Sequence, residues 1–233
     1  MHGWKSFVCG GLILLSASVS SLTEAGTVTS NINVYNATSA GNKLIELERY
    51  EEAKRYFIVA LNQEGTFAPA WLGLGVAFAY AETKDYDAAI DCEKKAIKFC
   101  DGDEQFKSKA VNNLSAYYYL RGNRYCDKGK YEKAIADYDQ SLELDPNCSA
   151  VYTNRGNAYR EEGNYDRAIV DYNFALEIDP TYAAPYYHRA LAYKRKEAFE
   201  QALADCEAYL SFEPSDQEAK KLRQELLETL QKK

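Results

Sequence analysis

A pattern that recurs every 34 residues constrains this chain more than any other feature. Three segments, 131–146, 165–180 and 199–214, align at this spacing, and each starts with an aromatic residue and ends with proline. A second run precedes each segment, with large and small residues four and three positions apart, which places them on one stripe of an α-helix. These residues are Tyr118, Gly122 and Tyr125, then Tyr152, Gly156 and Tyr159, then Tyr186, Ala190 and Tyr193. Each repeat is therefore predicted to be a pair of amphipathic helices.

Glycine, alanine and proline indicate where these helices end and touch. Gly129 and Gly163 tolerate positive φ and should end the first helix of a pair, and Asp-Pro at 145–146 and 179–180 should end the second. Small residues such as Gly156 and Ala168 let the backbones approach where the two helices cross. Aromatic side chains are expected to fill the space beside each crossing.

A 34-residue helix pair with tyrosine, glycine, alanine, an aromatic residue and proline at these offsets resembles the tetratricopeptide repeat. The resemblance implies an all-α solenoid, a right-handed superhelix of about five antiparallel helix pairs. Three clear repeats cover 115–148, 149–182 and 183–214, and two degenerate ones cover 34–67 and 68–101. Residues 102–114 are surplus and either extend the next helix or divide the array into two blocks. Residues 215–233 are expected to form a capping helix that starts with a capping box, Ser215 to Glu218, and has a leucine face.

The first 25 residues differ from the repeats. No charge occurs from Ser6 to Thr23, and a short apolar run, 7–15, is followed by small residues. This pattern resembles a secretory signal peptide and predicts an exported, periplasmic or secreted protein. An uncleaved membrane anchor is the main alternative, and a buried N-terminal helix is a weaker one.

Composition argues against several classes of function. The net charge of -7 without a basic cluster makes nucleic acid and anionic lipid poor partners. His188 is the only histidine besides His2, so we expect no enzyme, no metal site and no cofactor. Cys9 would leave with the signal peptide, and the remaining five cysteines are an odd number, so at least one has no partner within the chain. Cys92 and Cys206 fall on the inner faces of predicted helices.

The resemblance also implies that the first helices line a concave groove that holds an extended peptide or a helix of a partner protein. Asparagine suits capture of a peptide backbone, and Arg160, Lys194 and Arg195 favour an acidic ligand or a C-terminal carboxylate. Two alternatives remain: the asparagines reflect only the repeat consensus, or the charges form an ordinary solvated face. The candidate groove residues are Tyr119, Asn123, Thr153, Asn154, Asn157, Arg160, Tyr187, His188, Leu191, Lys194 and Arg195.

One ligand class known for the family is disfavoured. Repeats that bind chaperone C-termini use a clamp of lysine, arginine and asparagine for two carboxylates. Asn123 and Asn154 match this clamp, but Tyr119, Ala184 and His188 stand where it needs positive charge. The sequence therefore predicts an adaptor or assembly factor for other partners. Self-association through the extended helix or the terminal helix, and a regulatory subunit of an enzyme, are the alternatives.

Overall fold

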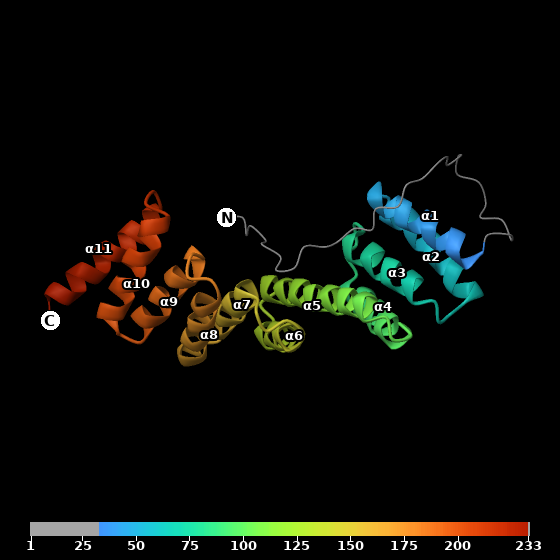
Figure 1. The fold of residues 1–233 in the computed structure, drawn as a ribbon. Helices are drawn as coiled ribbons and strands as arrows, with labels where there is room; N and C mark the ends of the chain where they lie inside the picture. Colours follow the sequence, from blue (N-terminus) through green and yellow to red (C-terminus); the bar gives the residue numbers. More distant parts are fainter. Residues whose placement is uncertain (1–32, 233) are drawn as a thin grey trace. The chain divides into compact units, whose positions relative to one another are not determined.

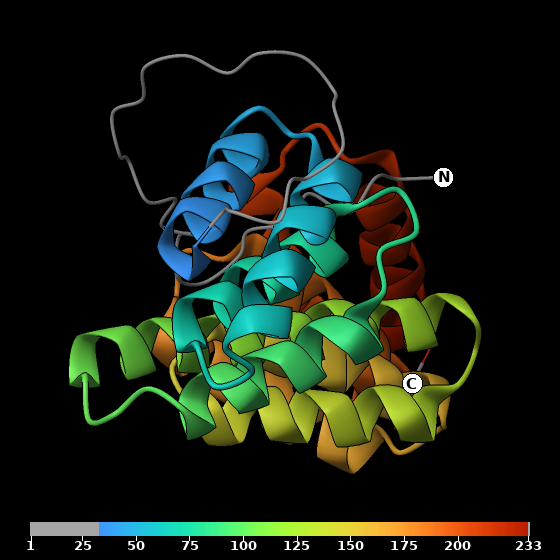
Figure 2. The same ribbon diagram turned by 90° about the vertical axis from the view of Figure 1, so that its right-hand side faces the viewer.

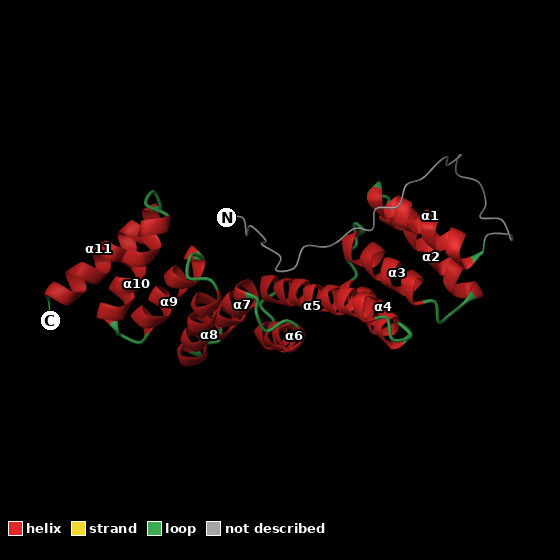
Figure 3. Ribbon diagram, in the orientation of Figure 1, coloured by secondary structure: helices red, strands yellow, loops and turns green. Residues whose placement is uncertain are grey.

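The computed structural model describes residues 33–232, and within them the chain forms eleven α-helices and no strand (Figure 1, Figure 3). The all-α solenoid fold is thereby confirmed. The helices are α1 (Val34–Glu46), α2 (Tyr50–Gln63), α3 (Ala68–Tyr80), α4 (Tyr86–Lys98), α5 (Glu104–Asp127), α6 (Tyr131–Leu144), α7 (Ser149–Glu161), α8 (Tyr165–Ile178), α9 (Ala183–Arg195), α10 (Phe199–Phe212) and α11 (Gln217–Gln231).

Two compact units divide the described chain: an N-terminal block of residues 33–120 and a C-terminal block of residues 121–232. The boundary lies within α5, which starts at Glu104. Residues 104–114, surplus to the 34-residue period, are thus helical and continuous with the helix that follows them.

Neighbouring helices in the sequence pack as pairs. In the N-terminal block α1 packs with α2 and α3 with α4, and α1 and α2 lie side by side in both ribbon views (Figure 1, Figure 2). In the C-terminal block α7 packs with α8, and α9 with α10. The helices α6, α8 and α10 begin 34 residues apart, and so do α7, α9 and α11. The terminal helix therefore takes the place of the first helix of a further pair, and it packs on α10.

The predicted contact between small and large residues is present in both blocks. A Cβ atom added to Gly156 would lie 2.7 Å from Cε1 of Tyr172, and one added to Gly122 would lie 2.7 Å from Cε1 of Tyr138. Both tyrosines are almost fully buried. Gly41 has the same relation to the ring of Phe57 in the N-terminal block. Glycine is thus required where the backbone of the first helix meets the aromatic ring of the second.

The second repeat departs from this pattern because a carboxyl group takes the place of the aromatic ring. Glu93 is 0% exposed, and a Cβ atom on Gly75 would lie 2.9 Å from its Oε1. Asn113 donates a hydrogen bond to Oε1 at 3.2 Å, while Oε2 has no partner among the described residues. Burial raises the pKa of Glu93 well above its ordinary value. The carboxyl therefore favours its neutral form in the folded protein.

The cap of the terminal helix differs from its prediction. Asp216, not Ser215, is the N-cap residue of α11, and its carboxylate accepts a hydrogen bond from the Ala219 amide at 3.0 Å. Leu222 and Leu226 are buried in a cluster with residues of α9 and α10. These two leucines are covered within the chain, whereas Leu230 is only half-buried, and self-association through α11 stays a prediction.

Two sequence predictions concern residues near the N-terminus and the thiols. The proposed signal peptide, residues 1–25, lies outside the described residues. No helix within residues 33–232 combines the length and the apolar character needed to cross a membrane. The five described cysteines form no disulfide with one another, and Cys92 and Cys206 are buried as expected.

The turn between the helices of a pair adopts the same left-handed conformation in successive repeats. Gly129 and Gly163 have φ of 66° and 79°, as predicted, whereas Glu197 has φ of 58° at the equivalent position of the last repeat. A residue with a Cβ atom is strained in this region, by roughly 1–2 kcal/mol.

We expect Glu197→Gly to raise the free energy of unfolding by about 1 kcal/mol, because glycine relieves this strain and loses only part of the gain to entropy. Urea denaturation measures the change. Gly163→Ala is the matched control and should lower the free energy of unfolding by a similar amount. A loss of stability in Glu197→Gly would show that the turn is not strained.

Candidate functional site

Most of the predicted groove residues lie on α7 and α9 of the C-terminal block, and several of them are buried. Thr153, Asn154 and Asn157 are 1%, 6% and 7% exposed. The hydroxyl of Thr153 donates to the Ser149 carbonyl at 2.7 Å within α7. Thr153 is therefore occupied by its own helix. Tyr119, which belongs to the N-terminal block, is also buried.

Asn123 and Asn154 form an amide contact between two first helices. Asn154 Nδ2 donates to Asn123 Oδ1 at 2.9 Å, and the hydroxyl of Tyr138 donates to the same oxygen at 2.7 Å. The asparagine pair thus joins α5 to α7 and holds the ring that packs on Gly122. For these two residues, the contacts match the alternative in which asparagine belongs to the repeat's packing.

Asn157, Arg160 and His188 gather around Tyr172 and form what we call the α7–α9 polar cluster. The Tyr172 hydroxyl donates to Asn157 Oδ1 at 2.8 Å, and the His188 ring stacks on the Tyr172 ring with centroids 6.1 Å apart. Three nitrogens of the cluster are buried without a hydrogen-bond partner among the described residues: Asn157 Nδ2, Arg160 Nε and His188 Nδ1. Tyr187 meets the His188 ring edge-on, at 5.8 Å between centroids.

The charge of the cluster comes from Arg160 alone. Burial, together with the Arg160 cation, lowers the pKa of His188 to about 3, so the imidazole is neutral at physiological pH. The Arg160 guanidinium contacts Glu161 at 2.8 Å, and the Glu161 side chain is 46% exposed. An ion pair of this exposure contributes little to stability. The arginine can therefore exchange this partner for a ligand at small cost.

The other predicted groove residues lie apart from the three unsatisfied nitrogens of the cluster. Lys194 Nζ contacts Glu225 of α11 at 2.6 Å in an exposed ion pair. Leu191 packs against the core between α9, α10 and α11, and Arg195 is exposed at the end of α9. Of the predicted cations, Arg160 is the one that the structure brings beside predicted polar residues. Within residues 33–232, no three His, Cys, Asp or Glu side chains lie together in a way that could hold a metal ion.

Sequence reasoning missed a second series with the 34-residue period, made of buried ion pairs. Each pair joins an arginine on a first helix to an aspartate 16 residues later on the second helix, through two hydrogen bonds. Arg155 Nε donates to Asp171 Oδ2 at 2.9 Å, and Nη2 donates to Oδ1 at 2.7 Å. The three aspartates are 2–6% exposed. The pairs are Arg121–Asp137, Arg155–Asp171 and Arg189–Asp205.

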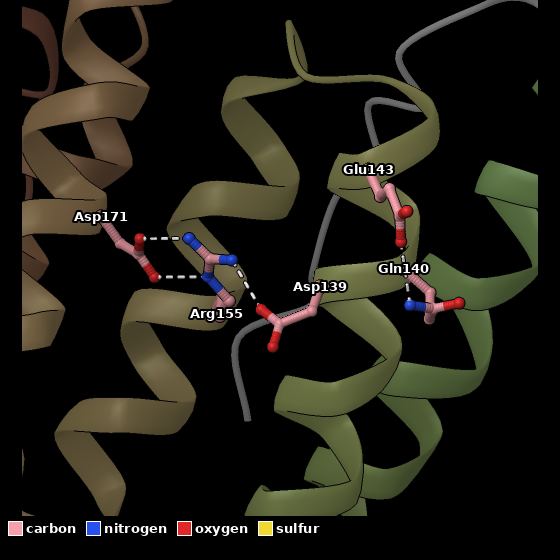
Figure 4. A network of polar contacts seen from close by, with 5 residues as sticks. All are labelled: Asp139, Gln140, Glu143, Arg155 and Asp171. Carbon is pink, nitrogen blue, oxygen red and sulfur yellow. Dashed lines mark hydrogen bonds and ion pairs between the residues drawn. The ribbon is translucent and has the colours of Figure 1, made fainter.

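Two of these arginines, and Arg223 of the terminal helix, also reach back to the preceding second helix. Arg155 Nη1 donates to Asp139 of α6 at 2.6 Å, so one guanidinium connects α6, α7 and α8 (Figure 4). Arg189 Nη1 donates to Asn173 of α8 at 2.5 Å, and Arg223 of α11 contacts Glu207 of α10 at 3.1 Å. We call this series the arginine ladder. It fixes the spacing of the first helices that carry the polar cluster.

Family models of a helical repeat match much of this chain. A model described as "TPR repeat" matches residues 122–159 and 156–196, and two described as "Tetratricopeptide repeat" match residues 38–104 and 183–216. Together they span more than half of the chain. No curated protein sequence matches the chain significantly.

Several solved structures resemble this one. The crystal structure of YrrB, "a TPR protein with an unusual peptide-binding site", is 22% identical with a TM-score of 0.61 and covers 84% of this chain and 94% of its own. The crystal structure of MamA is 21% identical with a TM-score of 0.56 and covers 75% of this chain and 94% of its own. The first TPR of Spaghetti (RPAP3), solved with an HSP90 peptide, is 29% identical over 50% of this chain and 94% of its own, with a TM-score of 0.49.

We expect Arg155→Leu to lower the free energy of unfolding by about 3–5 kcal/mol, because it leaves the buried Asp171 carboxylate without its cation. The second repeat carries Leu74 and Cys92 at the equivalent positions. The double change Arg155→Leu, Asp171→Cys should therefore cost less than Arg155→Leu alone. Chemical denaturation of the single and double variants measures the coupling between Arg155 and Asp171. If the two losses of stability add up in the double variant, the two residues are not coupled.

The lowered pKa of His188 predicts a loss of stability in acid. The unfolded chain takes up a proton near pH 6.5, whereas the folded chain does so only near pH 3, so stability falls as the pH drops between these values. His188→Phe keeps a ring on Tyr172 and should lose less stability than the wild type between pH 7 and pH 4.5. Tyr187→Phe, the matched control, should follow the wild type. If the free energy of unfolding depends on pH in the same way for all three proteins, His188 does not cause the loss of stability in acid.

Proposed function

Because the chain belongs to the tetratricopeptide repeat family, we propose that it is a non-catalytic adaptor or assembly factor that binds a peptide or a helix of a partner protein. The binding surface is formed by α7 and α9 around the polar cluster. The fold it shares with YrrB, described as having a peptide-binding site, supports a ligand of this class.

The observation that carries this proposal is the set of three buried nitrogens without partners. Buried polar groups in native proteins are nearly always hydrogen-bonded, and each exception costs about 1–3 kcal/mol. Here three such atoms occur in one cluster of α7 and α9, at positions where the sequence predicts ligand contacts. A protein that keeps these atoms unsatisfied loses stability, which is typical of a site maintained for binding.

The chemistry of the cluster favours a ligand that supplies hydrogen-bond acceptors. Asn157 Nδ2 and Arg160 Nε are donors, and the neutral His188 ring offers one donor and one acceptor. In this proposal the Arg160 guanidinium leaves the exposed Glu161 carboxylate and pairs with the ligand instead. A peptide with a backbone carbonyl for Asn157 and an acidic side chain for Arg160 satisfies both residues, because arginine pairs with carboxylates through two parallel hydrogen bonds.

We also propose that the protein acts after export, in a periplasm or a secretory pathway. The uncharged segment from Ser6 to Thr23 supports this location. Partners should accordingly be sought in envelope or secreted fractions, and the mass of the recovered chain tells whether residues 1–25 have been removed.

Affinity capture from such a fraction, with chemical cross-linking and quantitative mass spectrometry, tests the proposal. We expect Arg160→Gln, His188→Phe to reduce recovery of the partners about tenfold, equivalent to about 1.4 kcal/mol. The matched control is Lys220→Gln, which removes the same charge from an exposed residue of α11. Because the double variant removes unsatisfied nitrogens, its melting temperature should not fall. Equal recovery with both variants would refute the proposed surface.

A further inference from the structure

An apolar stripe covers the outer surface of α8, on the second helix of the fourth repeat. Val170, Phe174 and Ile178 are 50%, 45% and 38% exposed, although they are large hydrophobic residues. They lie four residues apart, which places them on one line along the helix, about 12 Å from first to last. We call these three residues the α8 ridge.

The packing of the repeat does not account for the ridge. The inner face of α8, with Ala168, Tyr172 and Ala175, is fully buried and makes the contacts that the repeat requires. At the positions equivalent to the ridge, the other second helices of the C-terminal block carry mostly small or polar residues. These are Ala136, Gln140 and Leu144 on α6, and Ala204, Ala208 and Phe212 on α10.

Phe174 is held in place by a neighbouring ring. Its side chain stacks on Tyr152 of α7, with centroids 5.4 Å apart, and the Arg155 guanidinium lies 5.4 Å from the centroid of the same tyrosine. Arg155 is in turn fixed by the arginine ladder. An aromatic side chain with few accessible rotamers loses little entropy on binding, so Phe174 suits the role of an anchor.

Acidic side chains surround the ridge. Because equivalent positions of successive repeats lie on the same face, the exposed outer residues of α6 and α10 flank those of α8. Exposed carboxylates occur at the start of all three helices and near the end of α6 and α8. Three cations neighbour them: Lys133 and Arg167 lie over tyrosine rings, and Lys196 forms an ion pair with Asp166. The carboxylates therefore outnumber the cations. The carboxylates are Glu132, Asp166, Glu200, Glu143 and Glu177.

We propose that the α8 ridge docks an amphipathic helix of a partner protein whose apolar stripe is flanked by lysine or arginine. A straight ridge with four-residue spacing packs along a helix whose own apolar residues recur every three or four positions. The acidic surround selects basic flanks and accelerates association with them. This surface uses a second helix, so it is separate from the polar cluster on α7 and α9, and the adaptor can hold two segments at once.

Binding of designed peptides to the full chain, measured by fluorescence anisotropy, tests this surface. The probe is an 18-residue helical peptide with leucine every three or four positions and lysine elsewhere, and its counterpart carries glutamate in place of lysine. We expect the lysine peptide to bind roughly tenfold more tightly than the glutamate peptide. Equal binding of the two peptides, or no binding of the lysine peptide, would overturn the proposal.

The variant Val170→Ala, Phe174→Gln places on α8 the residues that α6 carries, so it should fold, which its melting curve verifies. It should bind the lysine peptide roughly tenfold more weakly. Arg160→Gln, His188→Phe should bind this peptide like the wild type, which separates the ridge from the polar cluster. Unchanged affinity in the ridge variant would refute docking on α8. If the wild type sediments as a dimer and the ridge variant as a monomer, the ridge binds a second copy of the chain instead.

Discussion

The contact between a glycine on a first helix and a tyrosine ring on the second is the constraint on which two of the clear repeats, 115–148 and 149–182, depend. Gly156 leaves no room for a Cβ atom because the buried Tyr172 ring already occupies that space. The close crossing brings the two backbones together and, through the Tyr172 hydroxyl, orients Asn157. The packing of a repeat and the arrangement of its polar cluster therefore have the same origin.

The arginine ladder complements this contact with charge. Burial is the largest influence on Asp171 and raises the pKa of its carboxyl, against the opposing effect of Arg155. Desolvation thus offsets much of the attraction, which is usual for buried ion pairs. The directional hydrogen bonds of the guanidinium set the spacing between α6, α7 and α8, which apolar side chains would leave less defined. The second repeat, with Leu74 and Cys92 at these positions, shows that a helix pair forms without the ladder.

Periodicity in the sequence predicted the helix pairs, their turns and the glycine–aromatic contacts, because each depends on residue type and spacing alone. The spacing also placed Asn154 on a first helix. It did not predict that the Asn154 side chain bonds to Asn123, because Asn123 lies 31 residues earlier, on another helix. Arg155 and Asp171 were missed because charged residues on an amphipathic helix are normally solvated. Their recurrence every 34 residues was the available signal. The pairing of Lys194 with Glu225 depends on the packing of the terminal helix and had no such signal.

The joint between successive repeats is the same each time, and this bears on how such a chain can change length. Arg155, Arg189 and Arg223 each reach the residue 16 positions earlier, on the preceding second helix. Gain or loss of a complete 34-residue segment would recreate an equivalent joint on both sides of the change. Duplication can thus lengthen the array without redesigning its core, whereas an insertion of any other size must be absorbed by a helix, as α5 absorbs residues 104–114.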